Sequence, residues 1–351
     1  MTPTARSCNV AAGKVLCPRV AVLRSSQLPL RRRDRRWAVD TDWIESYTLD
    51  LRRGDGVGVF MRLLGAHVSI AGGVEKAPER GHELICNTIQ IFTKSNVQWA
   101  AKPLAARQKA GFLSNLDRFG IQMAFAHACY LINLCSADAA IRKRSWRGLA
   151  TEVERCAFLE LPYLVVHPGS HGGQGEQVAI EAIVQGTLWA VEKAARMKAG
   201  NLPMLLFETT AGQGNGVGWR LEQLAEILTR LKTLPVGICL DTCHIFAAGY
   251  DLRERHAYER TLADFDRCVG LDRIRVFHLN DSLGELDSRR DRHAHIGRGK
   301  IGLEGFRLLL NDPRFADRPM VIETPKGRTA SLDVANLRRL RRLIAPSSAT
   351  E

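Results

Sequence analysis

Short hydrophobic and β-branched runs alternate with longer amphipathic segments from about residue 61 to the end of the chain. This pattern is typical of a parallel sheet whose strands are joined by crossover helices. The strands are predicted at 63–68, 88–92, 122–126, 163–166, 204–207, 236–240, 274–277 and 320–322. The helices are predicted at 75–84, 105–119, 139–159, 176–198, 220–231, 256–269, 304–310 and 331–343.

The number and order of these elements favour a closed (β/α)₈ TIM barrel of the α/β class over an open sheet. No G-x-G-x-x-G motif follows the first strand, which further disfavours a dinucleotide-binding doubly wound sheet. We therefore expect residues 61–345 to form one TIM-barrel domain.

The first 60 residues differ from the rest of the chain in composition. They contain the basic runs 31–33 and 35–36, and no acidic residue precedes Asp34. This composition suits a disordered basic arm or an Arg-rich transit peptide, but Pro18 and Pro29 interrupt any long amphipathic helix. Because Met61 directly precedes the first predicted strand, we interpret residues 1–60 as a basic extension that is disordered or lies upstream of the true start.

The composition also sets limits on partners and compartment. No apolar run reaches the roughly 18 residues that a membrane span needs, so we expect no membrane association. The formal charge of +13 favours a polyanionic partner such as nucleic acid, because Lys and Arg that neutralise phosphates release counterions. The nine cysteines form no CxxC pair, which argues against a disulfide framework or a Cys₄ zinc site and favours a reducing compartment.

Side chains that bind metal ions follow most of the predicted strands. The C-terminal ends of barrel strands form the active-site face, so these residues converge there. A lone His or carboxylate at a strand end is more often structural, but burying many of them together is costly unless metal ions compensate. Zn²⁺ takes three or four protein ligands, so two or three ions fit, although Mn²⁺ or Fe²⁺ also suits a mixed site. The candidates are His127, His167, Glu208, Asp241, His244, His278, Asp291, His293 and Glu323.

Two local spacings support this constellation. Asp241 and His244 lie three residues apart where a strand turns into a loop, and Asp291 and His293 lie two apart in an extended loop. We expect Cys243 to pack rather than to bind metal. We expect three other histidines near the same face to orient the metal ligands by hydrogen bonds: His67, His171 and His295. His82 and His256 fall in predicted helices and are expected at the surface.

The ordered motifs of the chain resemble those of the endonuclease IV family of apurinic/apyrimidinic (AP) endonucleases. The matching stretches are GAHVSIAGG at 65–73, HACYLIN at 127–133, HPGSH at 167–171, ETTAGQG at 208–214, DTCHIFAAGYD at 241–251, HLND at 278–281, DRH at 291–293 and IET at 322–324. The resemblance implies a TIM barrel of the xylose isomerase-like superfamily that holds three zinc ions. It assigns them to His127, His167 and Glu208; to Glu208, Asp241, His278 and Glu323; and to His244, Asp291 and His293, with Glu208 as the bridging carboxylate.

The resemblance also implies the reaction, that of a deoxyribonuclease IV in base excision repair. This hydrolase cuts the phosphodiester 5′ to an abasic site in double-stranded DNA, leaves a 3′-hydroxyl and a 5′-deoxyribose phosphate, and removes blocked 3′ ends. Glu208 and Glu323 are the candidates to orient the attacking hydroxide or to take its proton. We expect a monomer in the bacterial cytoplasm.

Loops on the same face are predicted to contact DNA. An aromatic beside an apolar residue can wedge into a base stack, and an abasic nucleotide is easily extruded because no base pair is broken. Trp99 is equally suited to covering the barrel rim. The predicted DNA-contacting residues are Lys94, Gln98, Trp99, Tyr130, Leu131, Gln213 and Asn215. The chain departs from common family residues at Ser95, Val97 and Thr209.

Two alternatives stay open. A sugar isomerase or epimerase on the same barrel uses only four metal ligands and leaves the other five candidates unexplained. A DNA-binding paralogue without catalysis predicts the loss of at least one ligand, and none is missing from the sequence.

Overall fold

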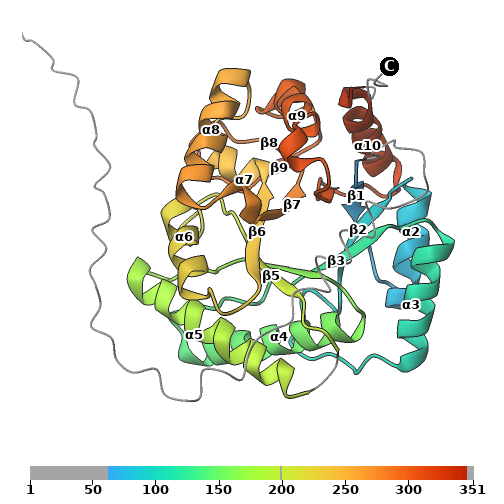
Figure 1. The fold of residues 1–351 in the computed structure, drawn as a ribbon, viewed down its shortest axis with the longest axis vertical. Helices are drawn as coiled ribbons and strands as arrows, with labels where there is room; N and C mark the ends of the chain where they lie inside the picture. Colours follow the sequence, from blue (N-terminus) through green and yellow to red (C-terminus); the bar gives the residue numbers. More distant parts are fainter. Residues whose placement is uncertain (1–61, 198–199, 346–351) are drawn as a thin grey trace, which may run out of the picture. The chain divides into compact units, whose positions relative to one another are not determined.

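A computed structural model describes residues 62–197 and 200–345, so the interpretation of residues 1–60 lies outside the described residues. Eight parallel strands close into a barrel in the order β1-β10-β7-β6-β5-β4-β3-β2 (Figure 1). The predicted TIM barrel is confirmed. Its strands are β1 (Leu64–His67), β2 (Thr88–Phe92), β3 (Met123–His127), β4 (Tyr163–Val166), β5 (Met204–Glu208), β6 (Val236–Asp241), β7 (Ile274–His278) and β10 (Met320–Ile322).

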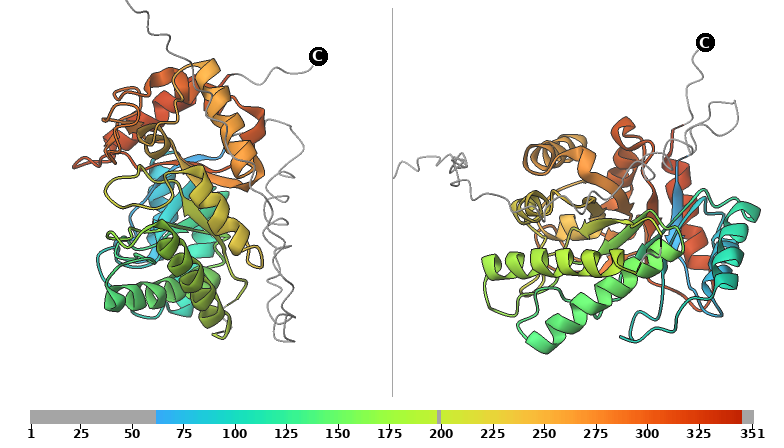
Figure 2. Two further views of the ribbon diagram at one scale, coloured as in Figure 1. Left: turned by 90° about the vertical axis from the view of Figure 1, so that its left-hand side faces the viewer. Right: turned by 60° about the horizontal axis from the view of Figure 1, so that its bottom comes forward.

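Helices cover the outside of the strands (Figure 2). The predicted helices all form, with ends that shift by a few residues. Helices α2 to α6 are Ala77–Glu83, Ala106–Arg118, Ala139–Phe158, Glu176–Ala195 and Leu221–Arg230; α7 to α10 are Thr242–Ala247, Arg255–Cys268, Gly302–Leu310 and Ser331–Leu343. The described residues also form the 3₁₀ turns η1 (Val74–Lys76), η2 (Leu271–Arg273) and η3 (Pro313–Phe315). Among the described residues, no helix combines the length and apolarity needed to cross a membrane.

The barrel interior is filled by side chains from every second position of the strands. In β3, for example, Met123 and Phe125 point inward and are 0% exposed. The interior cluster comprises Leu63, Met123, Phe125, Tyr163, Val165, Met204, Leu206, Cys239, Val276 and Val321. Because side chains alternate across a strand, the next inward positions after six of these residues belong to His127, His167, Glu208, Asp241, His278 and Glu323. The apolar interior thus ends in a layer of polar side chains at the C-terminal mouth.

Several polar candidates are the last residues of strands rather than the first residues of loops. His127 pairs in register with Phe92, and Asp241 pairs with His278. The prediction from hydrophobic runs ended each of these strands at its last apolar residue, but backbone pairing continues through the polar residue that follows. The strand ends predicted at 126, 207, 240 and 277 were therefore one residue short.

The segment after Asp241 is helical, which corrects the predicted loop. The carboxylate Oδ1 of Asp241 accepts a hydrogen bond from the backbone N–H of His244 at 2.9 Å and so caps the short helix α7. His244 lies on this helix and is 3% exposed. A six-residue helix is too short for its periodicity to be visible in the sequence.

A small antiparallel sheet, which the sequence did not predict, orders the segment after β7. It pairs β8 (Asp281–Ser282) with β9 (His293–Ala294). Asp281 is fully buried, and a Cβ at Gly299 would overlap its carboxylate. The Asp281 oxygens accept hydrogen bonds of 2.9–3.0 Å from the backbone N–H groups of Ser282, Gly297, Gly299 and Ile301. This arrangement fixes the segment that carries Asp291 and His293.

Candidate metal centre

The nine predicted metal ligands gather at the mouth of the barrel. Their candidate donor atoms form three groups, and within each group the atoms lie within 4.8 Å of one another. The groups have the same membership as the three ligand sets that the family resemblance implies. They are His127, His167 and Glu208; Glu208, Asp241, His278 and Glu323; and His244, Asp291 and His293.

Glu208, at the end of β5, belongs to two of these groups and is fully buried. Its Oε2 lies 3.1 Å from Nε2 of His127 and 2.9 Å from Nε2 of His167. Its Oε1 lies 2.9 Å from Nδ1 of His278 and 3.4 Å from Nδ1 of His244. The two oxygens therefore face different sets of imidazoles, as a bridging carboxylate requires.

The second group joins the ends of β6, β7 and β10. Nδ1 of His278 lies 3.1 Å from Oε2 of Glu323 and 3.8 Å from Oδ2 of Asp241. Asn280 ties two of these residues together: its Nδ2 donates to Asp241 Oδ2 at 2.6 Å, and its Oδ1 accepts from the backbone N–H of Glu323 at 2.8 Å. Asn280 is fully buried, and its two hydrogen bonds hold Asp241 and Glu323 in fixed positions relative to each other.

The third group lies nearest to solvent. Oδ1 of Asp291 is 3.2 Å from Nε2 of His244 and 3.5 Å from Nε2 of His293. The Asp291 side chain is 42% exposed, whereas that of His244 is 3% exposed. Burial raises the pKa of Asp291, but the imidazoles, His244 first, outweigh it and bring the pKa to about 2.

Backbone carbonyls orient three of the imidazoles. Nδ1 lies 2.7 Å from Ala128 O in His127, 2.8 Å from Thr209 O in His244, and 3.1 Å from Glu323 O in His293. A carbonyl oxygen only accepts hydrogen bonds, so Nδ1 carries the proton in each neutral ring. Their Nε2 lone pairs consequently face the carboxylates of the centre.

The electrostatics of the centre match what a divalent cation needs. Burial raises the pKa of Glu208, but His278 and His167 outweigh it and hold the pKa well below its usual range. Burial lowers the pKa of His278, yet Cys239 and the carboxylates of Glu323 and Glu208 raise it well above its usual range. Facing carboxylate oxygens and imidazole nitrogens attract shared protons or a cation between them. Five imidazoles and four carboxylates form a donor set that suits zinc.

Two thiols lie near the same atoms. Cys239 and Cys243 each fall within a group of possible metal donors. Burial raises the pKa of both thiols to about 12, which disfavours the thiolate form that binds metal. Cys243 is fully buried, as predicted.

The predicted orienting histidines behave differently from one another. Nδ1 of His67 lies 3.0 Å from Oε1 of Glu323, beside the centre. His171 instead accepts hydrogen bonds from the backbone N–H groups of its own loop, and His295 contacts Asn336. His82 and His256 are exposed on helices, as predicted.

The predicted DNA-contacting residues occupy several environments. Tyr130 is 55% exposed, and its ring meets the ring of Phe92 edge to face. Gln98, Gln213 and Asn215 are also exposed, and Oε1 of Gln213 accepts from the backbone N–H of Asp291. Trp99 and Leu131 are partly buried and pack against the core, which matches the alternative role of Trp99 as a cover of the rim.

Lys94 is buried, which the sequence did not indicate. It is 5% exposed, its ammonium lies 3.4 Å from a Glu152 oxygen, and it donates to Gln98 O at 2.8 Å. The charge of Lys94 therefore faces the protein, and its contact with DNA stays a prediction. Of the departures from the family, Ser95 and Val97 are exposed, whereas Thr209 accepts from the backbone N–H of Asp241 through its hydroxyl.

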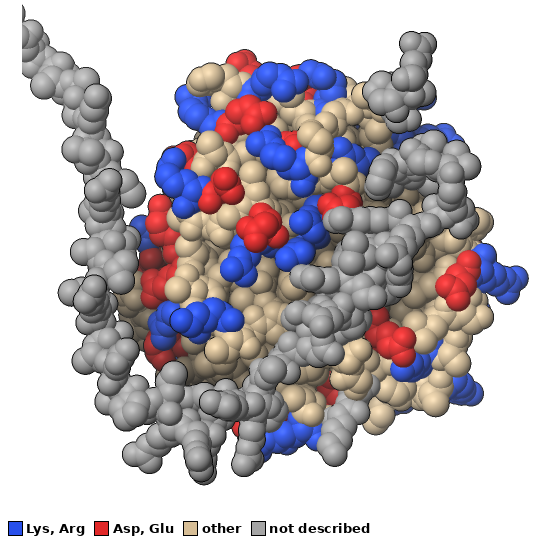
Figure 3. All heavy atoms as spheres, viewed as in Figure 1, with Lys and Arg blue, Asp and Glu red and all other residues tan. Residues whose placement is uncertain are grey.

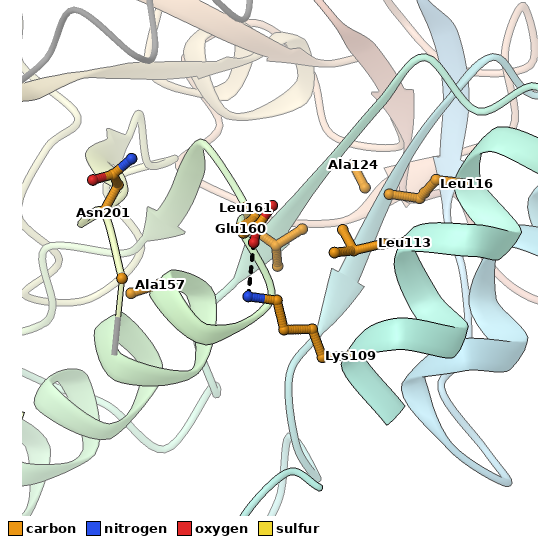
Figure 4. Close-up of a pocket in the computed structure, with 9 residues that line it drawn as sticks. Lys109, Leu113, Leu116, Ala124, Ala157, Glu160, Leu161 and Asn201 are labelled. Carbon is orange, nitrogen blue, oxygen red and sulfur yellow. Dashed lines mark ion pairs between the residues drawn. The ribbon is translucent and has the colours of Figure 1, made fainter. Parts of the chain in front are cut away.

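Clefts occur at both ends of the strands. The mouth holds one of about 270 Å³, whose walls include Tyr130, His167, Gln213, His244 and Asp291. A separate cavity of about 310 Å³ lies between α3 and α4, near the residues that precede β4 and β5, and the ion pair of Lys109 with Glu160 crosses it (Figure 4). Of these two hollows in the described part of the chain, the mouth cleft is the one lined by groups of metal donors.

Similarity to known proteins shows the family to which the chain belongs. The chain matches the xylose isomerase-like TIM barrel family over residues 79–343. It is 47% identical over 290 residues to a probable endonuclease 4 of Chloroflexus aggregans, an alignment that covers 82% of this chain and 100% of that protein. The chain belongs to the endonuclease IV family. The family resemblance is confirmed, and with it the enzyme class, a hydrolase of the deoxyribonuclease IV type that serves DNA repair.

Solved structures agree with this assignment. The chain superimposes on endonuclease IV from Thermus thermophilus with a TM-score of 0.71 and 41% identity, covering 81% of this chain and 98% of that one. A 3-keto-D-glucoside 4-epimerase of E. coli gives a TM-score of 0.57 at 13% identity, covering 80% of this chain and 100% of that one. At that identity the likeness shows the fold alone, so it lends no support to the sugar epimerase alternative.

Proposed function

We propose that this chain is a zinc-dependent AP endonuclease. It hydrolyses the phosphodiester 5′ to an abasic site in double-stranded DNA, leaves a 3′-hydroxyl and a 5′-deoxyribose phosphate, and removes blocked 3′ ends. The observation that carries the proposal is the shared carboxylate of Glu208, whose Oε2 faces Nε2 of His127 and of His167 and whose Oε1 faces Nδ1 of His278. A carboxylate shared in this way joins neighbouring cation sites into one multinuclear centre.

The three donor groups would each hold one zinc ion. Zinc supplies Lewis acidity, which stabilises charge on a phosphoryl oxygen and brings the pKa of water toward neutrality. Glu208 and Glu323 are the carboxylates placed to orient water or to take its proton. The Glu323 side chain is 12% exposed and Glu208 is 0% exposed, so Glu323 is the one within reach of a substrate at the mouth.

The loops around the mouth would hold the DNA. Tyr130 is the exposed aromatic beside His127 and His167, so it is the residue placed to enter a gap left by a missing base. Arg290 and Arg292 are exposed on either side of Asp291, and we assign them to phosphate contacts that the sequence analysis did not predict. Figure 3 shows Lys and Arg interleaved with Asp and Glu over the described part of one face, so the basic residues of this face are spread over several elements.

The experiment is incision of an end-labelled duplex that carries one tetrahydrofuran analogue of an abasic site. The analogue blocks β-elimination, so a 5′ cut reports hydrolysis. We expect the intact chain to cut and to contain about three zinc ions, because each ion takes three or four protein ligands. Glu208→Ala should lose zinc and lower the incision rate by at least about 100-fold, the range of a lost electrostatic contribution to the transition state.

The matched control is Glu304→Ala on α9, whose carboxylate pairs with nearby Arg307 and is about half exposed. It should cut at the rate of the intact chain. If the folded, zinc-loaded chain fails to cut, the AP endonuclease proposal is wrong, and ketose and aldose sugars become the next substrates to assay.

A further inference from the structure

His278 is oriented by a side chain, whereas three other candidate ligands are oriented by the main chain. His127, His244 and His293 each place Nδ1 within 3.1 Å of a backbone carbonyl oxygen. His278 has the opposite arrangement: its Nδ1 faces two carboxylates, and its Nε2 lies 2.8 Å from Oε1 of Gln90. A backbone carbonyl oxygen is present whichever amino acid occupies the position. The acceptor that faces Nε2 of His278 is a side-chain oxygen, so it depends on residue 90 being a glutamine.

Gln90 lies at the centre of a buried polar network. It is on β2, at an inward-facing position between Ile89 and Ile91, and is 0% exposed. Besides its contact with His278, its Nε2 lies 2.6 Å from Oε1 of Glu323 and 2.8 Å from Nδ1 of His67. Its amide therefore uses both polar atoms, and all of these partners lie in or beside the metal centre.

The carboxylate of Glu323 determines which way the Gln90 amide points. A carboxylate accepts hydrogen bonds and repels a carbonyl oxygen, so the amide nitrogen must face Glu323 and the amide oxygen must face His278. Because an amide oxygen only accepts, Nε2 of His278 must be the donor. In the neutral ring, Nδ1 of His278 is then unprotonated, and it faces Oε1 of Glu208 at 2.9 Å and Oε2 of Glu323 at 3.1 Å.

We propose that Gln90 is a positioning residue of the metal centre. It holds His278 in the Nε2–H tautomer and engages Oε1 of Glu323, so that Nδ1 of His278 and Oε2 of Glu323 point into the same cation site. The inference rests on the proposed metal centre. Gln90 is fully buried, and its amide contacts the side chains of His278, Glu323 and His67, so it acts through these neighbours and does not touch a substrate. Hydrogen-bond partners of metal ligands typically contribute about 10–100-fold to metal affinity.

The test compares Gln90→Met with Thr88→Val. Methionine keeps the length of the side chain and removes the hydrogen bonds of the amide to His278, Glu323 and His67. Thr88 is a buried neighbour two positions earlier on the same face of β2, and its hydroxyl donates to Met123 O, away from the ligands. Each protein is stripped with a chelator and titrated with Zn²⁺ against a competing chelator, and with Co²⁺ while the visible spectrum is recorded. No DNA is needed.

In Gln90→Met we expect one zinc equivalent to bind about 10–100-fold more weakly and one component of the Co²⁺ spectrum to change. The remaining equivalents should bind as in the intact chain, and Thr88→Val should match the intact chain throughout. A folded Gln90→Met protein with unchanged zinc affinities and an unchanged Co²⁺ spectrum overturns the proposal. Absence of zinc binding by the intact chain would instead contradict the proposed function, so the two failures are distinguishable.

A second measurement needs no variant of Gln90. Nitrogen-15 NMR of the histidine-labelled, zinc-loaded chain reports which ring nitrogen carries the proton, and loss of one set of signals in His278→Ala assigns His278. We expect His278 to be protonated at Nε2 and bound to metal through Nδ1. A proton on Nδ1 of His278 would overturn the orientation argument even if Gln90→Met did not fold.

Discussion

At the scale of single residues, the buried carboxylates of this protein are stabilised by partners of different kinds. Glu208 faces imidazoles, Asp281 accepts four backbone hydrogen bonds, Glu152 pairs with Lys94, and Asp312 is held by an arginine. Burying an unpaired charge costs several kcal/mol, so each carboxylate depends on its partners. Those far from the metal centre can be tested without affecting metal binding.

Asp312 provides such a test. It is 5% exposed, its Oδ2 accepts from the Tyr258 hydroxyl at 2.7 Å, and Nε of Arg314 donates to its Oδ1 at 2.9 Å. Burial raises the pKa of Asp312, but Arg314 and Tyr258 outweigh it and bring the pKa below its usual range. We expect Asp312→Asn to lower the free energy of unfolding by about 1.5–3 kcal/mol at pH 7, the size of hydrogen bonds to a charged group.

The pH dependence has a definite sign. The pKa of Asp312 is lower in the folded protein than in the unfolded chain. The ionised Asp312 therefore contributes its full stabilisation above about pH 4, the pKa of an unfolded Asp, and this stabilisation is lost as the pH falls through the pKa of the folded protein. Denaturant unfolding of chelator-treated protein should therefore show a difference between intact chain and variant that shrinks under acid conditions. Asp272→Asn, at a side chain that is 77% exposed, serves as the control and should change little. A difference that grew on acidification would contradict the assignment.

The candidate ligands were predictable from the sequence, but most of their partners were not. His127 or Asp291 carries a signal because imidazoles and carboxylates at strand ends are costly unless they bind something. Gln90 and Asn280 carry none by themselves, since an amide has no charge to explain, although a glutamine inside the apolar strand TIQIF is unusual enough to be noticed. The burial of Lys94 was not predicted, because its partner Glu152 lies far along the chain.

At the scale of elements, one residue of α4 fastens two loops of the mouth. Glu152 is 1% exposed. It accepts from the Thr93 hydroxyl at 2.6 Å and lies 3.4 Å from the Lys94 ammonium, both in the loop after β2. It also accepts from the backbone N–H of Cys129, next to Tyr130 in the loop after β3, at 3.2 Å. The loops proposed to contact DNA thus share one buried anchor.

Removing the charge of this anchor should loosen both loops. We expect Glu152→Gln to lower the free energy of unfolding by about 3–5 kcal/mol, because Lys94 is left buried without a counter-charge. Hydrogen exchange should increase in residues 93–104 and 128–134, while zinc content stays that of the intact chain.

The double variant Glu152→Gln with Lys94→Met separates charge from packing. Removing both charges should recover most of the lost stability, since replacing a buried pair by apolar groups is often neutral. Additive effects of the two substitutions in a double-mutant cycle would show that Lys94 and Glu152 do not interact, and would contradict the shared anchor.

At the scale of the whole barrel, the alternation of inward and outward side chains along each strand builds both the apolar interior and the candidate metal centre. The same inward register that fills the interior with Phe125, Val165 and Leu206 delivers His127, His167 and Glu208 to the mouth. The sequence predicted this because hydrophobic runs and ligand types are local signals. The small sheet of β8 and β9 was not predicted, because it depends on Asp281 meeting backbone N–H groups up to 20 residues away.

Because the proposed centre draws its candidate ligands from the C-terminal ends of six barrel strands, from α7 and from residues 291–293, metal ions bound there should stabilise the barrel as a whole. A ligand that binds only the folded state adds about 2.7 kcal/mol when present at 100 times its Kd. We expect removal of zinc by a chelator to lower the apparent Tm by several degrees, because about 1 kcal/mol corresponds to roughly 2–4 °C in domains of 150–250 residues. Scanning calorimetry at one fixed scan rate measures the shift.

Glu208→Ala decides whether the shift arises at the centre. Glu208 is the residue common to two donor groups, so its loss should abolish most of the chelator effect and leave an apparent Tm close to that of the chelator-treated intact chain. Glu304→Ala should keep the full shift. A chelator effect of equal size in Glu208→Ala would mean that the stabilising ions bind at a site other than the one to which Glu208 belongs.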